Sequence, residues 1–392
     1  MGPLRPISPI SQCLRHTQLF QPPTANNRQR LSTIVNNSKL PYPPNLPLDN
    51  LRRLRSNSAR MNLKSLAGLV VLVCASFASA QSPAEPDVPA ATTATVTANA
   101  PQPTTFSFKD GDRLVLLGNT VLEREHDYGS FEPRLDLALG EEKVSVRNLA
   151  WSGDTVFGHA RSYFGPPEEG LQRLSTHLEM LKPTVVILCY GSELAFERLG
   201  SLPEFLTGYR NLIDLIRSKS PGVRIIIATP PPLETLPPPL PDLSAENKNL
   251  SSLRDALRKF SIAQNAFFVD WFELMGGLPK PGIIRKPLTE NGVHYTREGY
   301  EKLSAKLIEG LGLKLPDAPT PALENLRRAV IAKDTLFFNR WRPHNETYLF
   351  GFRKHEQGQN AKEIPMFDPL IAQGDEAIQK LKEEALQQTR RP

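Results

Sequence analysis

The stretch PTVVILCYGSE, residues 183–193, decides the fold class. It holds an uninterrupted apolar run from Val185 to Tyr190, followed at once by a glycine and two polar residues. A short run of this kind, which is rich in β-branched residues and contains no charged residue, predicts a strand that is buried on both faces. Such strands belong to parallel sheets whose two faces are covered by helices.

Four further runs of the same type occur along the chain, and amphipathic segments separate them. The predicted strands are 113–117, 144–149, 185–190, 223–228 and 267–271. Apolar residues recur at helical spacing around 171–181, 205–218, 250–264 and 297–311. This alternation predicts an α/β protein, a three-layer α/β/α sandwich around a five-stranded parallel sheet with right-handed crossovers.

Polar and glycine-containing segments follow the predicted strands, at the sheet edge where such folds gather their functional groups. Gly118–Thr120 follows the first strand, Trp151–Asp154 the second and Gly191–Glu193 the third. The fourth strand leads into a Pro-rich loop, 230–241. This loop has two open interpretations, a rim or lid over the site and a passive surface loop.

The first 104 residues read as a leader and not as part of the fold. Residues 61–80, MNLKSLAGLVVLVCASFASA, have the basic start, short apolar run and small final residues of a secretory signal, which favours cleavage near Ala80. A retained membrane helix is the alternative, but the run is short for a bilayer. Residues 1–60 are expected to be a disordered or misassigned extension, and 81–104 an Ala/Pro/Thr-rich linker. We therefore expect an exported protein, periplasmic or extracellular, with no stable membrane anchor after cleavage.

The charge balance changes when the leader is removed. The 392-residue chain has a net charge of +6, but residues 1–80 hold 10 of its 47 Lys+Arg and 1 of its 41 Asp+Glu, which leaves 37 against 40. The remaining chain is near −3, so its charge gives no support to nucleic-acid binding. Only Cys189 of three cysteines lies outside the leader. No disulfide, thiolate metal site or cofactor is predicted.

The predicted domain covers 105–315, and a different pattern follows it in 316–392. An amphipathic helix near 322–334 leads into RWRPHNETYLFGFRKHEQGQNAKEIPMFDPLI and then a charged helix at 375–388. Two interpretations of this helical appendage are open. In the first, its charges are solvated and it packs on the domain through three aromatic side chains, Trp341, Tyr348 and Phe350. In the second, basic side chains lie over the mouth of the site as substrate contacts, namely Arg340, Arg342 and His344.

The order of these motifs resembles the SGNH (GDSL-like) hydrolase family, and more closely a secreted bacterial subgroup with a Gly-Asn-Thr first block. The similarity spans roughly Asp110–Leu311, and the segment after the domain is also similar to that subgroup. The family blocks read Gly-Asp-Ser, Gly, Gly-x-Asn and Asp-x-x-His; here they are Gly118–Thr120, Gly153, Gly191–Glu193 and Asn291–His294. The resemblance implies a flavodoxin-like SGNH fold and hydrolysis of acyl or acetyl esters, including those of carbohydrates, without a cofactor.

Residue by residue, the resemblance makes Thr120 the nucleophile, His294 the general base and Asn291 the group that orients the imidazole. Oxyanion or substrate contacts are expected at four positions, Asn119, Gly153, Gly191 and Glu193. Acyl transfer needs a hydroxyl, an imidazole to take its proton, and donors aimed at the oxyanion. The γ-methyl of threonine hinders attack, and an asparagine that accepts from the ring N–H gives no charge to stabilise an imidazolium.

Several alternatives stay open at these positions. Thr120 also fits as the cap of a helix beginning near Val121, and His294 as a histidine that bonds its own loop. Ser152 or Ser192 could be a relocated nucleophile. An ionised Glu193 would repel an oxyanion, whereas burial would raise its pKa and let it donate a hydrogen bond. This carboxyl also has the chemistry to bind a sugar hydroxyl or an appendage arginine.

Three functions therefore compete. The first is an ester hydrolase, and the second is an inactive module on the same fold that binds a glycan or acylated ligand. A nucleotide- or flavin-binding domain is the third, and it is disfavoured because the turn GNTVLERE, residues 118–125, lacks the glycines that let a backbone approach phosphate. A small-molecule or carbohydrate ester is the expected partner.

Overall fold

The computed structural model describes residues 103–163, 165–197, 201–279 and 286–389. The predicted extension 1–60, the signal 61–80 and all but the end of the linker 81–104 lie outside the described residues. In the described part, no helix combines the length and the apolar composition that a membrane crossing requires.

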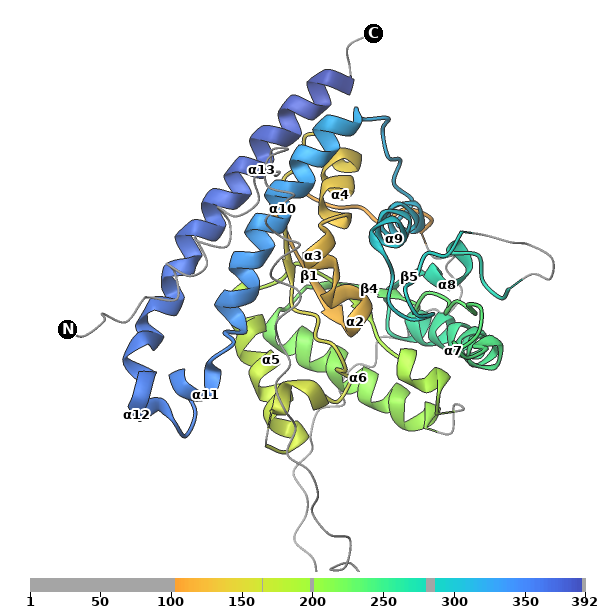
Figure 1. Ribbon diagram of the computed structural model, residues 1–392, viewed down its shortest axis with the longest axis horizontal. Coiled ribbons are helices and arrows are strands. Elements are labelled where there is room, and N and C mark those ends of the chain that lie inside the picture. Colours follow the sequence, from red (N-terminus) through yellow and green to blue (C-terminus); the bar gives the residue numbers. More distant parts are fainter. Residues whose placement is uncertain (1–102, 164, 198–200, 280–285, 390–392) are drawn as a thin grey trace, which may run out of the picture. The chain divides into compact units, whose positions relative to one another are not determined.

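A five-stranded parallel sheet forms the centre of the domain (Figure 1). Its strands are β1 (Asp112–Gly118), β2 (Val144–Asn148), β3 (Val185–Cys189), β4 (Arg224–Ala228) and β5 (Phe267–Val269). They lie in the order β2-β1-β3-β4-β5, and every neighbouring pair is parallel. All five predicted strands are confirmed, as is the α/β class. The parallel arrangement places the carboxyl ends of β1 to β4 and their following loops at one edge.

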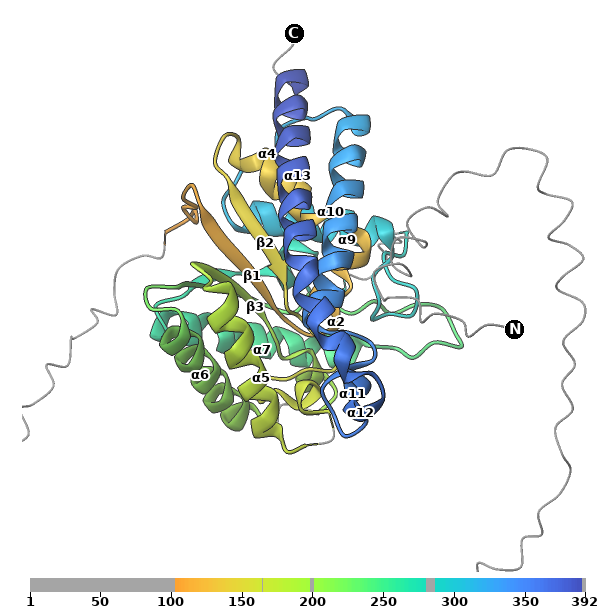
Figure 2. The same ribbon diagram turned by 90° about the vertical axis from the view of Figure 1, so that its left-hand side faces the viewer.

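Helices cover both faces of this sheet (Figure 2). One layer contains α5 (Pro167–Leu181), α6 (Leu202–Lys219) and α7 (Ser244–Ala263), and the other contains α4 (Phe131–Leu139) and α9 (Arg297–Gly310). The amphipathic segments predicted from the sequence coincide with α5, α6, α7 and α9, whereas α4 was not predicted. Its polar residues hid it, because Glu132, Arg134 and Asp136 are buried there.

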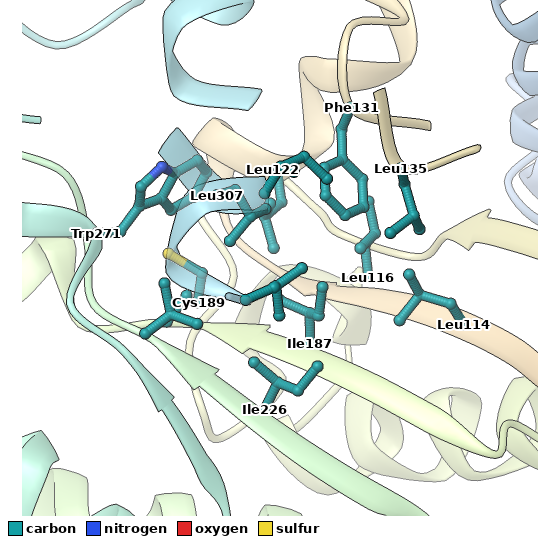
Figure 3. Packing of buried hydrophobic residues seen from close by; sticks show 14 of the residues in the cluster. Leu114, Leu116, Leu122, Phe131, Leu135, Ile187, Cys189, Ile226, Trp271 and Leu307 are labelled. Atoms are coloured by element: carbon teal, nitrogen blue, oxygen red, sulfur yellow. The ribbon is translucent and has the colours of Figure 1, made fainter. Parts of the chain in front are cut away.

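One hydrophobic core lies between the sheet and the layer of α4 and α9 (Figure 3). Alternate residues of the central strands, such as Leu114, Leu116 and Ile187, point toward Phe131 of α4 and Leu307 of α9. These side chains are at most 3% exposed. Each contributes about 1.5–3 kcal/mol by leaving water, so this layer fixes where the loops at the sheet edge begin.

Short helices connect the longer elements. Two of them, α2 (Thr120–Glu123) and α3 (Glu125–Tyr128), follow β1 directly, and α8 (Trp271–Leu274) follows β5. Single 3-10 turns occur at η3 (His159–Ser162) and η4 (Ser192–Ala195). These turns direct the chain away from the sheet edge and leave polar side chains there.

The appendage is a helical hairpin formed by α10 (Thr320–Trp341) and α13 (Phe367–Thr389) (Figures 1 and 2). Between them lie α11 (Glu346–Leu349), α12 (Lys354–Gln357) and η5 (Gly358–Met366). The pair packs against Leu137 of α4 through apolar residues, which are Ala322, Leu326, Val330, Ile378 and Ala385. Both helices are longer than predicted.

A set of buried and half-buried charges, here called the ionic seam, joins the appendage to the domain. Its members are Glu132, Asp136, Arg147, Lys333, Asp334, Asp375 and Lys382. Lys333 Nζ lies 2.5 Å from a Glu132 carboxylate oxygen and 3.0 Å from Asp334, and its side chain is fully buried. Lys382 lies 3.5 Å from Asp136, and Arg147 lies 2.5 Å from Asp375.

The seam corrects the expectation that the charges of the appendage are solvated. Of the aromatic residues expected to pack on the domain, Trp341 is buried, but Phe350 is 52% exposed. The appendage is therefore held by buried aromatic rings such as Trp341 and Phe337, by an apolar helix interface and by paired charges.

Candidate active site

A cavity of ≈ 220 Å³ opens at the carboxyl edge of the sheet, between the loops that follow β1 to β4 and the loop before α9. Thr120 and His294 both line it, although 174 positions separate them in the sequence. Other predicted site residues on its wall are Asn119, Gly153 and Glu193. The structure thus brings together five of the predicted site residues in one pocket.

Thr120 is the first residue of α2, directly after β1. The preceding Asn119 occupies the N-cap position, and its side chain makes no capping bond. The interpretation of Thr120 as the cap of a helix beginning near Val121 is therefore wrong. Among the described residues, the Thr120 hydroxyl has no hydrogen-bond partner. A Cβ at Gly118 would lie 2.5 Å from the Cys189 carbonyl oxygen, so glycine there lets the strand end approach β3.

His294 lies on a tight loop that its own backbone closes. The Glu290 N–H donates to the His294 carbonyl at 2.8 Å. The Asn291 side-chain oxygen accepts from the backbone N–H groups of Val293, at 3.1 Å, and His294, at 2.9 Å. This loop geometry turns the imidazole into the pocket.

The orientation of Asn291 sets the tautomer of His294. Because Asn291 Oδ1 is used by two backbone donors, its Nδ2 is the atom that faces His294 Nδ1, at 3.1 Å. An amide NH₂ only donates, so Nδ1 is the acceptor and the neutral ring holds its proton on Nε2. The sequence suggested that Asn291 accepts a bond from the ring, and the structure corrects this. The ring is oriented, but in the tautomer opposite to that of a general base.

The loop after β2 is ordered by polar contacts. Gly153 lines the pocket with φ +75°, a conformation that favours glycine. Asp154 also lines it and forms an ion pair at 2.6 Å with Arg161, both side chains being 1% exposed. The Ser152 hydroxyl and N–H both donate to Glu123. Ser152 is thus engaged outside the pocket wall.

The loop after β3 supplies Ser192 and Glu193 to the wall. The Ser192 hydroxyl accepts from Asn119 Nδ2 at 2.5 Å. Burial raises the pKa of Glu193 to about 7, against lowering by backbone hydrogen bonds. The expected direction of that shift is confirmed. Gly191, with φ +107°, does not line the pocket but turns the chain beneath it, where a Cβ would lie 2.8 Å from Leu253.

None of the three basic appendage residues expected at the mouth lines this pocket. Arg340 pairs with Asp368 at 2.7 Å, Arg342 pairs with Glu123, and the exposed His344 lies beside the Phe338 ring. The interpretation as substrate contacts is thereby corrected. The physical reason is that ion pairs with Asp368 and Glu123 hold the two arginines away from the pocket wall.

A different arginine, Arg124, lines the pocket. It lies one helical turn after Thr120, so both side chains share a face. Its guanidinium donates to the Tyr128 hydroxyl at 3.0 Å and lies 3.7 Å from the exposed Glu290. The spacing of four residues from Thr120 was the sequence signal for this cation.

A second missed residue, Glu234, ties the Pro-rich loop to the His294 loop. Its carboxylate accepts from the N–H of Thr289 at 2.7 Å and from the Thr289 hydroxyl at 2.6 Å, and its N–H donates to the Gly292 carbonyl at 2.9 Å. Pro230 and Pro231 line the pocket. The start of the Pro-rich loop is therefore a fixed wall of the site. The signal was a lone carboxylate in an otherwise apolar loop.

Apolar side chains form most of the remaining wall and the mouth. They include Val121, Leu233, Tyr295 and Tyr300, with Phe196 54% and Val293 38% exposed. Within the described ranges, His, Cys, Asp and Glu side chains form no group of three able to hold a metal ion. The pocket is suited to a small ligand with an apolar part and one polar group near Thr120.

Residues 111–302 match the model of the GDSL-like Lipase/Acylhydrolase family. This region of the chain is similar to that family. The GDSL-like domain so defined contains Thr120, Gly153 and His294, and it ends before the appendage. No curated protein is similar enough to the chain to count as a match.

Solved structures resemble parts of this chain at low identity. A catalytic mutant of an acetylxylan esterase from Geobacillus stearothermophilus is 17% identical, with 53% of this chain and 98% of that chain covered and a TM-score of 0.38. A lipase/acylhydrolase from Enterococcus faecalis is 23% identical, with 53% and 100% covered and a TM-score of 0.37. A gut microbial diltiazem-metabolizing enzyme is 11% identical, with 73% and 97% covered and a TM-score of 0.47.

Proposed function

We propose that this chain is an exported hydrolase, periplasmic or extracellular, that cleaves small acyl or acetyl esters, including those of carbohydrates. Thr120 is the nucleophile, His294 the proton acceptor and Asn291 the residue that orients the ring. The observation that supports this proposal is that Thr120, Gly153 and His294 line one small pocket in a GDSL-like domain.

The chemistry follows from these positions. The Thr120 hydroxyl oxygen attacks the ester carbonyl as its proton passes to His294, and the oxyanion is stabilised by the N–H groups of Thr120 and Gly153. The first N–H of a helix has no acceptor within that helix, which leaves the Thr120 N–H available. The intermediate then expels the alcohol, which takes the proton from His294. Water then attacks the acyl-threonine as His294 takes a proton from the water. His294 returns this proton to the Thr120 oxygen when the acid leaves.

One structural feature makes this a slow hydrolase. In the neutral ring, Nδ1 accepts from Asn291, so Nε2 bears the proton and has no lone pair for the Thr120 hydroxyl. Turnover therefore requires the proton to move to Nδ1, at the cost of the Asn291 bond. A misassigned tautomer of a catalytic histidine costs about 10⁴-fold in rate in a well-studied serine protease.

The same feature favours a second candidate function, an inactive module that binds a glycan or an acylated ligand. An Nε2–H donor and the free Thr120 hydroxyl suit a ligand carbonyl or hydroxyl that is held and not cleaved. The two functions share the pocket and differ in whether the proton leaves Nε2.

Turnover of an ester panel by the full chain separates these functions. We expect slow hydrolysis of 4-nitrophenyl acetate, 4-nitrophenyl butyrate or an acetylated oligosaccharide, with loss of at least about 10²-fold in His294→Ala and Thr120→Ala. His344→Ala is the matched control, because that exposed histidine lies outside the pocket wall. If wild type and His294→Ala hydrolyse every ester equally, the hydrolase proposal fails. Export is tested separately, by the cell fraction that contains the processed chain.

A further inference from the structure

The region that follows the family match has no part in the chemistry proposed above, yet one of its residues reaches the active-site loops. Arg342 follows α10, and its guanidinium forms an ion pair with Glu123 of α2. The same guanidinium lies 3.8 Å from the centre of the Trp151 ring, in the loop after β2. The Arg342 side chain is 25% and that of Glu123 11% exposed, so the pair is largely shielded from water.

Glu123 uses its two oxygens for two different elements. One oxygen accepts from Arg342, and the other accepts from the Ser152 hydroxyl and from the Ser152 N–H, the latter at 2.9 Å. Hydrogen bonds to an ionised carboxylate are stronger than neutral ones. Ser152 immediately precedes Gly153, whose N–H is the proposed oxyanion donor. The carboxylate therefore fixes the peptide next to that donor.

The same loop is held from behind by aromatic contacts with the appendage. The Trp341 ring meets Trp151 edge to face at 5.6 Å between centres. The Arg161 guanidinium lies 5.7 Å from Trp151 and 5.9 Å from Trp341, and it pairs with Asp154 of the pocket wall. The end of α10 thus supports both sides of the Ser152–Gly153 turn.

Glu123 is also the last residue of the helix that begins with Thr120. It consequently links the segment that holds the proposed nucleophile to the segment that holds the proposed oxyanion donor. Removing Arg342 would leave this carboxylate partly buried without a cation. A carboxylate in that situation turns toward water, and Ser152 would lose its acceptor.

We propose that Arg342 is a positioning residue of the active site, which holds Glu123 in place and thereby sets the Ser152–Gly153 turn against Thr120. The C-terminal appendage is then a component of the site, although none of its described residues lines the pocket. The catalytic half of this inference rests on the proposed ester hydrolysis, and the structural half does not.

The test compares two arginines of the appendage in the full chain. Arg342→Met removes the charge and keeps an apolar stem over Trp151, whereas Arg340→Met removes a pair with Asp368 outside the site. In Arg342→Met we expect kcat for 4-nitrophenyl acetate to fall about 10–100-fold with KM within about twofold. Arg340→Met should leave both unchanged, and Arg342→Lys should restore part of kcat because it returns a cation to Glu123.

A second readout needs no turnover. Amide hydrogen exchange of a peptide covering residues 149–156 should become about tenfold faster in Arg342→Met, stay at the wild-type rate in Arg340→Met, and recover in part in Arg342→Lys. The melting temperature of each variant identifies any general loss of folding.

Three results would overturn the inference or part of it. Wild-type exchange in Arg342→Met shows that the arginine does not order the loop. Faster exchange with unchanged kcat shows that the loop order does not serve catalysis. An equal effect in both methionine variants shows a general weakening of the appendage. If wild type hydrolyses no ester, the proposed function fails on its own, and the exchange rates still decide whether Arg342 orders the turn.

Discussion

The ionic seam and the pocket contain similar types of polar and charged residue. In the seam these residues are paired, whereas in the pocket part of their bonding capacity is unused among the described residues. In the seam, Lys333, Lys382 and Arg147 each have a carboxylate within 2.5–3.5 Å. Among the described residues of the pocket, the Thr120 hydroxyl has no partner, and Arg124 reaches only a tyrosine hydroxyl and an exposed glutamate at 3.7 Å. Paired buried charges fix an interface, whereas polar groups with spare bonding capacity are available to a ligand. The number of bonding partners thus separates structural polar residues from those available to a ligand.

The largest effect is expected on kcat/KM, when the pocket receives a carboxylate like those of the seam. In Asn291→Asp, the carboxylate can accept from the backbone donors that Asn291 Oδ1 now serves and also from the ring Nδ1–H. The neutral ring then exposes a basic Nε2, so we expect kcat/KM for 4-nitrophenyl acetate to rise about 10²–10⁴-fold.

Asn325→Asp is the matched control, because it adds the same charge on α10, which does not line the pocket. An Asn291→Asp variant no faster than wild type would contradict the tautomer argument. It would favour the binding module.

The second prediction concerns stability and removes a cation from the ionic seam. Lys333→Met removes the cation and leaves Glu132 and Asp334 buried together, so we expect the free energy of unfolding to fall by about 3–5 kcal/mol in chemical denaturation. Burial raises the pKa of Glu132, and loss of Lys333 raises it further. A buried carboxyl with a raised pKa stabilises the fold when protonated and loses that contribution as pH rises, so the variant should be least stable at alkaline pH.

Arg297→Met is the comparison for this prediction. Arg297 forms exposed pairs with Glu301 and Glu324, so its replacement should cost less than about 1 kcal/mol. Equal losses in the two variants would mean that the seam is no more important than surface pairs.

The smallest effect concerns Glu193 and pH. The pKa of Glu193 is raised by burial to about 7, so this carboxyl is neutral below that pH and ionised above it. The ionised form repels the oxyanion, and we expect kcat/KM to fall on the order of tenfold as pH rises from 6 to 8. Glu193→Gln stays neutral and should lose this decrease. A decrease of the same size in both proteins would assign it to another group.

The sheet could be predicted from local sequence patterns, whereas the placing of Thr120 and His294 in one site was implied by the resemblance to the SGNH hydrolase family. Buried strands are recognised by uncharged runs that are rich in β-branched residues. The parallel order of the strands places the loops that follow them at one edge of the sheet. The start of α13 was predicted at 375, whereas it begins at Phe367. Pro369 lies in the first turn of α13, where proline is tolerated because no earlier helical carbonyl awaits its N–H.

Other features of the site depended on contacts that one sequence does not reveal. The position of Arg342 follows from where α10 crosses the domain, which is set by the apolar contacts with Leu137 and by the seam. The direction of the Asn291 amide follows from two backbone donors of its own loop, and either direction fits the same four-residue motif.

The junction of Gly292 with Glu234 limits how this protein can change its substrate. A Cβ at Gly292 would lie 2.6 Å from the Glu234 carbonyl oxygen, so any larger residue there pushes the proline-lined wall and the histidine apart. On the proposed function, we expect no variant that admits bulkier acyl groups to arise on that side without losing activity. Enlargement is expected instead at other residues of the wall, such as Val121 or Phe196, which belong to neither the histidine loop nor the Pro-rich loop.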